Sequence, residues 1–373
     1  MIPFNLPMVV GNEAQYLQDV LKNKKLSGDG TFNKKASALI KERTGSLYVT
    51  LTPSCTAALE MAYLLIDLQP GDEVILPSFT FTSSATAIVL FGATPVFVDI
   101  DQSMNLDIDQ VLKAVTAKTK AVCVVHYAST SCDLDLLRAR LPKHIYIVED
   151  AAQAIGATYK GRALGSIGEL GAYSFHETKN VLCGEGGALL VNHPDLVARA
   201  EILKDKGTNR QKFLRGEVDK YTWQDKGSSY LLPELAAAYL LAQLEKQDDI
   251  NAKRLKLWNL YFAKLNTLAS EKTFQLPVIP DHNLQNAHIF YLILANPQMA
   301  VNLALHLKKQ NIQAVSHYVP LHNSPAGKRF GRTGENLANT EHKAAALIRL
   351  PLFYDLSENE IEIISSAVLN FFK

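Results

Sequence analysis

The sequence has no excess of charge of one sign, which argues against polyanionic partners. Its 373 residues include 38 lysines and arginines against 37 aspartates and glutamates, a formal net charge of +1. Without a run of basic residues, nothing concentrates a field that would hold nucleic acid or an anionic membrane. Hydrophobic residues make up 47% and charged residues 20%, which is ordinary for a chain that folds throughout. We therefore expect neither a nucleic-acid partner nor membrane insertion.

Cysteine is scarce, and the few thiols are scattered. The chain has four cysteines, none of them in a C-x-x-C pair. This scatter predicts free thiols in a reducing compartment and no metal site. The first residues form no secretory signal, and no stretch approaches the ~20 apolar residues of a membrane span. These absences predict a cytoplasmic protein.

What the sequence does have is a repeated alternation of short apolar runs and helical segments. Segments with helical spacing lie at 56–65, 83–91, 106–115 and 134–140. The apolar runs lie at 48–51, 73–76, 95–98, 121–125, 145–148, 172–175 and 188–191. This alternation is typical of an α/β fold with a mostly parallel sheet and helices on both faces. Ligands of such sheets bind beyond the carboxyl ends of the strands.

The pattern changes after about residue 232 to a long amphipathic helix that connects two regions. Prolines and polar residues at 277–283 then interrupt the chain, and a mixed α/β tail follows, ending in a helix over 358–372. We expect a large domain with an N-terminal segment over residues 1–245 and a smaller C-terminal α/β domain over residues 246–373.

One strand end carries a lysine of interest. Residues 174–180 read Ser-Phe-His-Glu-Thr-Lys-Asn and are followed by a glycine-rich stretch at 184–187. This places Lys179 after a buried strand and before flexible glycines. An isolated lysine in such a loop is usually a solvated surface group. Lys179 therefore needs chemically suitable partners before it can be considered catalytic.

Three other strand ends supply candidate partners. Asp150 ends an apolar run and precedes small residues that let a flat ligand approach, although it could instead cap the next helix. The turn at Ser54, Cys55 and Thr56 opens a helix whose free N–H groups suit a phosphate, with simple N-capping by Ser54 as the alternative. Phe81 brings an aromatic ring to the third strand end, where core packing is the alternative.

Together these four features match the requirements of pyridoxal 5′-phosphate. They are a lysine for the imine, a carboxylate at the pyridinium nitrogen, phosphate donors at a helix start, and a ring stacked on the cofactor. The carboxylate keeps the ring nitrogen protonated, so the ring can accept electrons when a Cα proton is removed. A desolvated lysine amine can carry that proton. The sequence therefore predicts Lys179 and Asp150 as catalytic residues.

The same motifs resemble those of the DegT/DnrJ/EryC1/StrS sugar aminotransferases. The resemblance covers nearly the whole chain, through residues 2–5, 28–30, 52–59, 70–74, 149–153, 174–180 and 317–322. It implies the fold type I of pyridoxal-phosphate-dependent transferases and a homodimer with shared active sites. Related sugar dehydratases carry histidine at the position of Lys179, so the lysine favours transamination.

The resemblance also implies roles for individual residues. Many family members supply an asparagine across the dimer from the segment matching 227–232, but Leu231 stands here, so Ser228 or Ser229 would replace it. Lys179 would form the imine and Asp150 would pair with the pyridinium nitrogen. The other cofactor contacts would be Cys55, Thr56 and Ser174 at the phosphate, Gln153 near the phenolic oxygen, and Phe81 on the ring.

Residues 175–180, 206–210, 219–223 and 227–230 resemble a branch that acts on dTDP-linked 4-keto sugars. This implies transfer of the amino group of L-glutamate to C4 of dTDP-4-dehydro-6-deoxy-D-glucose. The products would be 2-oxoglutarate and dTDP-4-amino-4,6-dideoxy-D-galactose, for surface polysaccharides such as lipopolysaccharide O-antigen and enterobacterial common antigen. The alternatives are C3 transfer to a dTDP-3-keto-6-deoxyhexose and a non-catalytic regulator that binds the cofactor. Expected substrate contacts are His126, His176, Arg215, Lys220, His317 and Tyr318.

Overall fold

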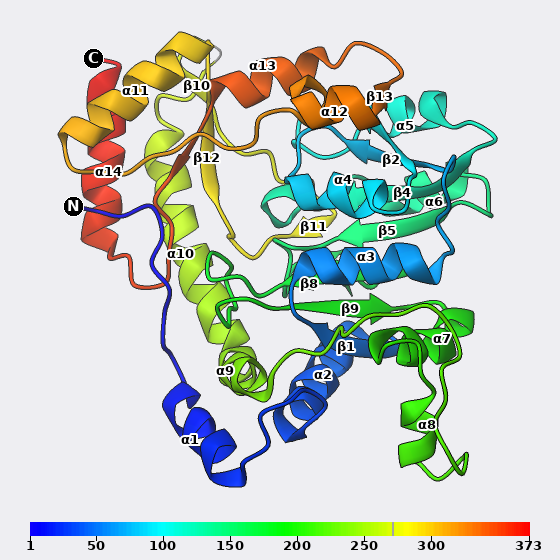
Figure 1. Ribbon diagram of the computed structural model, residues 1–373. Helices are drawn as coiled ribbons and strands as arrows, with labels where there is room; N and C mark the ends of the chain where they lie inside the picture. The colour runs from blue at the N-terminus through cyan, green and yellow to red at the C-terminus, as the bar shows by residue number, and fades with distance from the viewer. Residues whose placement is uncertain (271) are drawn as a thin grey trace.

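A computed structural model describes residues 1–270 and 272–373, which fold around an eight-stranded sheet (Figure 1). Its strands pair in parallel from β8 to β13, whereas β9 is antiparallel to both of its neighbours. The expected mostly parallel sheet is therefore confirmed. In spatial order the strands are β1 (Tyr48–Thr52), β9 (Gly187–Val191), β8 (Leu170–Ser174), β5 (Tyr146–Asp150), β4 (Thr119–Val125), β2 (Glu73–Pro77), β3 (Thr94–Val98) and β13 (Arg332–Thr333).

Helices cover both faces of this sheet because its inner strands are apolar on both sides. In β4, Val122 and Val124 pack into one core, whereas Cys123 and Val125 pack into the other. The first core is covered by α2 (Thr31–Thr44), α5 (Ile108–Ala114), α6 (Leu134–Arg140) and α9 (Glu234–Glu245). The second is covered by α3 (Cys55–Leu65), α4 (Thr82–Val89) and α7 (Pro194–Lys204).

The C-terminal part of the chain forms its own core around a three-stranded sheet. The N-terminal segment joins it, because Ile2 pairs with Ile312, and the two chain ends lie on the same side of the molecule in Figure 1. The sheet contains β10 (Phe274–Gln275), β12 (Phe290–Leu294) and β14 (Leu347–Leu350). The helices are α10 (Gln247–Leu265), α11 (Pro297–Lys309), α13 (Ala338–Ala346) and α14 (Glu358–Phe371).

The long connecting helix expected after residue 232 is interrupted. It consists of α9 and α10, which meet at Lys246, where the backbone leaves helical geometry with φ −105° and ψ 6°. Among the described residues, no helix is both long and apolar enough to cross a membrane. The remaining elements are α1 (Glu13–Asn23), α8 (Arg210–Leu214), α12 (Pro325–Phe330), a small sheet of β6 (Thr158–Tyr159), β7 (Arg162–Ala163) and β11 (Asn283–Leu284), and short 3₁₀ turns at Tyr127–Ser129 and Leu321–Asn323.

The start of α3 lies at the carboxyl edge of the parallel strands. Ser54 caps this helix by accepting a hydrogen bond from the Ala57 N–H at 3.1 Å. Gly187 opens β9 beside it and pairs with Ser174 at the end of β8. A Cβ on Gly187 would lie 2.4 Å from the Ser54 carbonyl carbon, so only glycine permits this approach. The helix start and the ends of β5 and β8 therefore face one space.

Candidate active site

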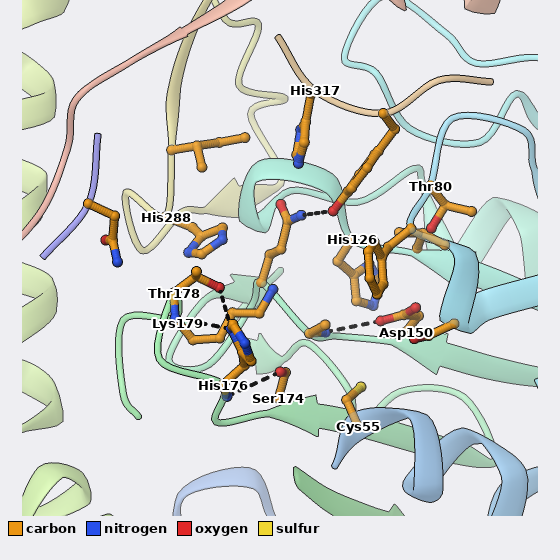
Figure 2. A pocket seen from close by; sticks show the side chains of 18 of the residues that line it. Cys55, Thr80, His126, Asp150, Ser174, His176, Thr178, Lys179, His288 and His317 are labelled. Carbon is orange, nitrogen blue, oxygen red and sulfur yellow. Dashed lines mark hydrogen bonds between the residues drawn. The ribbon is translucent and has the colours of Figure 1, made fainter. Parts of the chain in front are cut away.

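That space is a cavity of about 610 Å³ at the carboxyl ends of β4, β5 and β8. The sheet supplies one side, and residues of the N-terminal segment and the C-terminal part supply the other, including Phe4, Asn5 and Arg349. Figure 2 shows Lys179, Asp150, Ser174 and Cys55 gathered around it. The predicted site residues that line the cavity are Cys55, Thr56, Phe81, His126, Asp150, Gln153, Ser174, His176, Lys179, His317 and Tyr318.

Lys179 lies in the loop after β8 and is partly buried in the cavity wall. Its backbone N–H donates to the His176 carbonyl oxygen at 2.9 Å, which fixes the turn that carries it. Burial lowers the pKa of Lys179, the charge of Arg349 adds to this effect, and Asp150 and Cys55 oppose it. In the described part of the chain, its Nζ atom has no hydrogen-bond acceptor, so the amine is available to a ligand.

Asp150 ends β5 and is 5% exposed. Ser84 donates a hydrogen bond to its Oδ2 atom at 2.6 Å, and the Ala152 N–H donates to Oδ1 at 3.2 Å. Both donors favour the charged carboxylate, which would otherwise be costly in such a buried position. The carboxylate thus presents a negative charge to the cavity, as expected for a group that faces a protonated ring nitrogen.

Small polar groups cluster where α3 begins. The Thr56 hydroxyl oxygen lies 2.7 Å from that of Ser83 in α4, and Ser174 ends the neighbouring strand β8. The first N–H groups of α3 and its positive dipole end suit an anion at this place. Phe81 stands beside them with 57% of its surface exposed, so its ring is free to cover a flat ligand in the cavity.

Gln153 is held at both ends of its amide. Its Oε1 atom accepts the Ala128 N–H at 2.8 Å, and its Nε2 atom donates to the Tyr318 hydroxyl at 3.0 Å. His317 stacks on Tyr318 with ring centroids 3.6 Å apart. Burial, together with the charges of Arg349 and Lys179, lowers the pKa of His317 far below its usual range. The imidazole is therefore neutral at pH 7.

His126 and His176 meet the cavity in different ways. His126 is fully buried. Its Nε2 atom lies 2.7 Å from the Oε2 atom of Glu149, the residue that precedes Asp150 in β5. Burial alone would raise the pKa of Glu149, but hydrogen bonds from His126 and from the backbone of Gly165 and Gly168 outweigh it, so that pKa is lowered. His126 therefore braces the cavity wall, whereas His176 is partly exposed beside Lys179.

Three expected contacts lie outside the cavity lined by the described residues. Arg215 is exposed and pairs with Glu201 at 3.0 Å and Glu217 at 2.5 Å, so its charge is engaged on the surface. Lys220 and Ser229 are exposed in the segment that follows α8, and Ser229 pairs with Asp205 just after the end of α7. Of the two charges that suggested a nucleotide contact, that of Arg215 is thus paired within this chain.

The structure also adds residues that sequence reasoning missed. His288 and Arg349 reach the cavity from the C-terminal part, and Ser83 reaches it from α4. His288 accompanies the loop of Lys179, because its Nδ1 atom lies 3.0 Å from Oδ1 of Asn180. The sequence signal that could have identified His288 is its position as a polar residue just before the apolar strand β12. Nothing in the sequence places Arg349 near Lys179.

The residues present fit pyridoxal 5′-phosphate. The amine of Lys179 is unpartnered, the Asp150 carboxylate has donors but no ion-pair partner in the described part of the chain, and the first turn of α3 offers N–H groups to a phosphate. An exposed aromatic ring stands beside them. These are the chemical types that the cofactor requires.

Comparisons with known proteins agree with this chemistry. The spore coat polysaccharide biosynthesis protein SpsC of Bacillus subtilis (strain 168) is 31% identical over 385 residues, covering 100% of this chain and 97% of the relative. The crystal structure of S. venezuelae DesV in complex with a ketimine intermediate superposes with a TM-score of 0.88 at 31% identity, covering 96% of this chain and 94% of DesV. The PMP form of the putative sugar aminotransferase Spr1654 from Streptococcus pneumoniae superposes with a TM-score of 0.90 at 26% identity. The superposition covers 100% of this chain and 99% of Spr1654.

The model of the DegT/DnrJ/EryC1/StrS aminotransferase family matches residues 7–369. The match therefore spans both the large sheet with the Lys179 loop and the C-terminal part that closes the cavity. Since nearly the whole chain is included, the chain belongs to the DegT/DnrJ/EryC1/StrS aminotransferase family.

Proposed function

We propose that this aminotransferase transfers the amino group of L-glutamate to C4 of dTDP-4-dehydro-6-deoxy-D-glucose. The products are 2-oxoglutarate and dTDP-4-amino-4,6-dideoxy-D-galactose. The cofactor is pyridoxal 5′-phosphate. The observation that carries the proposal is the Lys179 amine, without a hydrogen-bond partner among the described residues, in one cavity with the Asp150 carboxylate and the start of α3.

The bound cofactor supplies an electron sink that stabilises negative charge at the carbon losing its proton. Lys179 would hold the cofactor through its amine, and the freed Nζ atom would take the α-proton of the donor. The lowered pKa of Lys179, caused mainly by burial, favours the neutral amine that this step needs. The same amine later delivers a proton to C4 of the sugar. Asp150 would keep the ring nitrogen of the cofactor protonated, and Phe81 would cover its ring.

An anionic amino donor suits the positive charge opposite the sheet. Arg349 donates from Nε and Nη2 to the Ser316 carbonyl oxygen at 3.2 and 3.0 Å, and the ring of Phe4 lies 4.7 Å from its Cζ atom. In the described part of the chain, no carboxylate pairs with this guanidinium. Burial lowers the pKa of Arg349, yet the group stays charged at pH 7. We infer that its free N–H groups bind the donor's α-carboxylate.

Replacing Arg349 with glutamine should raise the KM for glutamate by about 10- to 100-fold, because a hydrogen bond to a charged group contributes about 1.5–3 kcal/mol. The KM for the nucleotide sugar should change little. Arg349→Lys keeps the charge but lacks the planar guanidinium, so its KM for glutamate should lie between those of the wild type and Arg349→Gln. Steady-state kinetics with each substrate varied will measure this. Equal increases in both KM values would contradict the assigned role.

The sugar assignment rests on the family resemblance and on the relatives. The name of SpsC connects that relative with spore coat polysaccharide synthesis, which supports a role for this chain in bacterial surface polysaccharide synthesis, including O-antigen or enterobacterial common antigen. Transfer to C3 of a dTDP-3-keto-6-deoxyhexose is the alternative within the same chemistry. A non-catalytic regulator is the alternative of another class, and the intact pair of Lys179 and Asp150 speaks against it.

The decisive experiment incubates the holoenzyme with glutamate and either dTDP-4-keto- or dTDP-3-keto-6-deoxyhexoses, and identifies products by mass spectrometry and NMR. We expect an axial amine at C4, as in a galacto sugar. An amine at C3, or an equatorial amine at C4, would contradict the substrate assignment. A protein that binds the cofactor but aminates none of these sugars would contradict the enzymatic proposal.

We also propose a cytoplasmic homodimer in which the partner's segment 227–232 completes each cavity, with Ser229 near the phosphate. Exposed apolar side chains between α8 and this segment support this, among them Trp223 at 81% exposure. Contacts from Arg215 and Lys220 to the nucleotide sugar would likewise be made across the dimer. Sedimentation at working concentration should give a closed dimer. A fully active monomer would contradict the shared site.

A further inference from the structure

The first turn of α4 is tied to two residues on opposite sides of the cofactor site, through consecutive serines. Ser84 Oγ donates to Oδ2 of Asp150 at 2.6 Å, and Ser83 Oγ lies 2.7 Å from Oγ1 of Thr56. Asp150 ends β5, whereas Thr56 is in the first turn of α3. One short segment therefore contacts both the predicted ring-nitrogen partner and a predicted phosphate contact.

A third hydroxyl fixes the direction of the hydrogen bonds at Asp150. Thr80 Oγ1 lies 2.8 Å from Ser84 Oγ. The single hydroxyl proton of Ser84 is directed to the carboxylate, which can only accept, so Thr80 must be the donor to Ser84. Thr80 is 1% exposed, Ser84 is 0% exposed and Asp150 is 5% exposed. The chain of donors thus runs through the protein interior and ends on the carboxylate.

These bonds restrict both the charge and the orientation of Asp150. Ser84 occupies one lone pair of Oδ2, and the Ala152 N–H occupies one of Oδ1. With a donor at each oxygen, the plane of the carboxylate is fixed, and its charge is compensated without an ion-pair partner in the described part of the chain. Each oxygen keeps further lone-pair capacity for a donor in the cavity.

We propose that Ser84 is a positioning residue that, supported by Thr80, holds the Asp150 carboxylate ionised and oriented toward the ring nitrogen of pyridoxal phosphate. Ser83 serves the other end, where its contact with Thr56 fixes the phosphate-facing turn of α3. This inference rests on the proposed function, since it requires the cofactor in this cavity. It assigns separate tasks to adjacent serines, so the pair provides its own matched control.

The test measures dissociation constants of the apo-protein for two ligands. One is pyridoxal phosphate, and the other is its 1-deaza analogue, in which C–H replaces the ring nitrogen and the phosphate is unchanged. Ser84→Ala should weaken binding of pyridoxal phosphate about tenfold more than binding of the analogue, since a charge-assisted hydrogen bond is lost behind the carboxylate. Thr80→Val should act in the same direction more weakly. Ser83→Ala should weaken both ligands equally.

If Ser84 had a purely structural role, its replacement would weaken binding of both ligands by the same factor. Equal increases of the two dissociation constants in Ser84→Ala would therefore overturn the inference. Wild-type protein that binds both ligands equally would overturn it as well, because Asp150 would then not sense the ring nitrogen. If Ser84→Ala does not fold, the nearly isosteric Thr80→Val provides the test. A ratio of the two dissociation constants unchanged from the wild type in Thr80→Val would contradict the proposal. Wild-type protein that binds neither ligand would instead refute the proposed function.

Discussion

Replacing Lys179 with alanine should lower kcat by about 10⁴-fold, the upper end of what a positioned acid–base group contributes. In the described part of the chain, the other basic side chains that line the cavity are Arg349 and four histidines, of which His126 is held by Glu149 and His176 by Thr178. An arginine stays protonated, and the pKa values of His288 and His317 lie far below neutrality because both rings are buried. Neither ring can hold the proton that Lys179 must carry between two carbons.

The readout should separate chemistry from folding. Reduction of wild-type holoenzyme with borohydride should leave the cofactor attached to the peptide that contains Lys179, and the variant should yield no such peptide. Lys118→Ala removes an exposed lysine outside the cavity and serves as the control. A label on another lysine, or a Lys179→Ala variant with near-normal turnover, would show that the catalytic base lies elsewhere.

The strands of the sheet could be predicted from the sequence because each one follows from a local pattern. Runs such as Val122–Val125 are apolar on both sides, which only a strand covered on both faces explains. The side chains at the strand ends then fall together by geometry, so the pattern of residues alone was enough to associate Asp150 with Lys179. The break at Lys246 escaped prediction, although the apolar spacing lapses there across the polar residues 245–249.

Residues contributed by the C-terminal part could not be predicted in the same way. Arg349 and Lys179 are far apart in sequence, and only the packing of the smaller sheet against the larger one brings them to one cavity. Ser84 was missed for a different reason, since serine at a helix start has an ordinary explanation as a cap. The contacts expected of Arg215 and Lys220 stay predictions, because charge alone does not reveal that Arg215 pairs with Glu201 within this chain.

Asp150→Asn should separate two properties of this side chain, its shape and its charge. The amide has nearly the same size, and its oxygen can still accept from Ser84 or from the Ala152 N–H. It carries no negative charge, so it cannot hold a proton on the ring nitrogen, and the electron sink is weakened at the step where Lys179 removes the α-proton. We expect kcat to fall by about 10²- to 10³-fold, since breaking a buried charge pair costs about 3–5 kcal/mol.

The KM for glutamate should change far less, because Arg349 and not Asp150 faces its carboxylate. Asp99→Asn is a matched control: Asp99 is also 5% exposed and follows a strand of the same sheet, but it accepts hydrogen bonds from Asn339 and Thr340 away from the cavity. That variant should lose stability with nearly normal kcat per folded molecule. If Asp150→Asn keeps most of its kcat while the absorption spectrum of the bound cofactor stays unchanged with pH, the carboxylate does not act on the ring nitrogen, and its charge must serve another purpose.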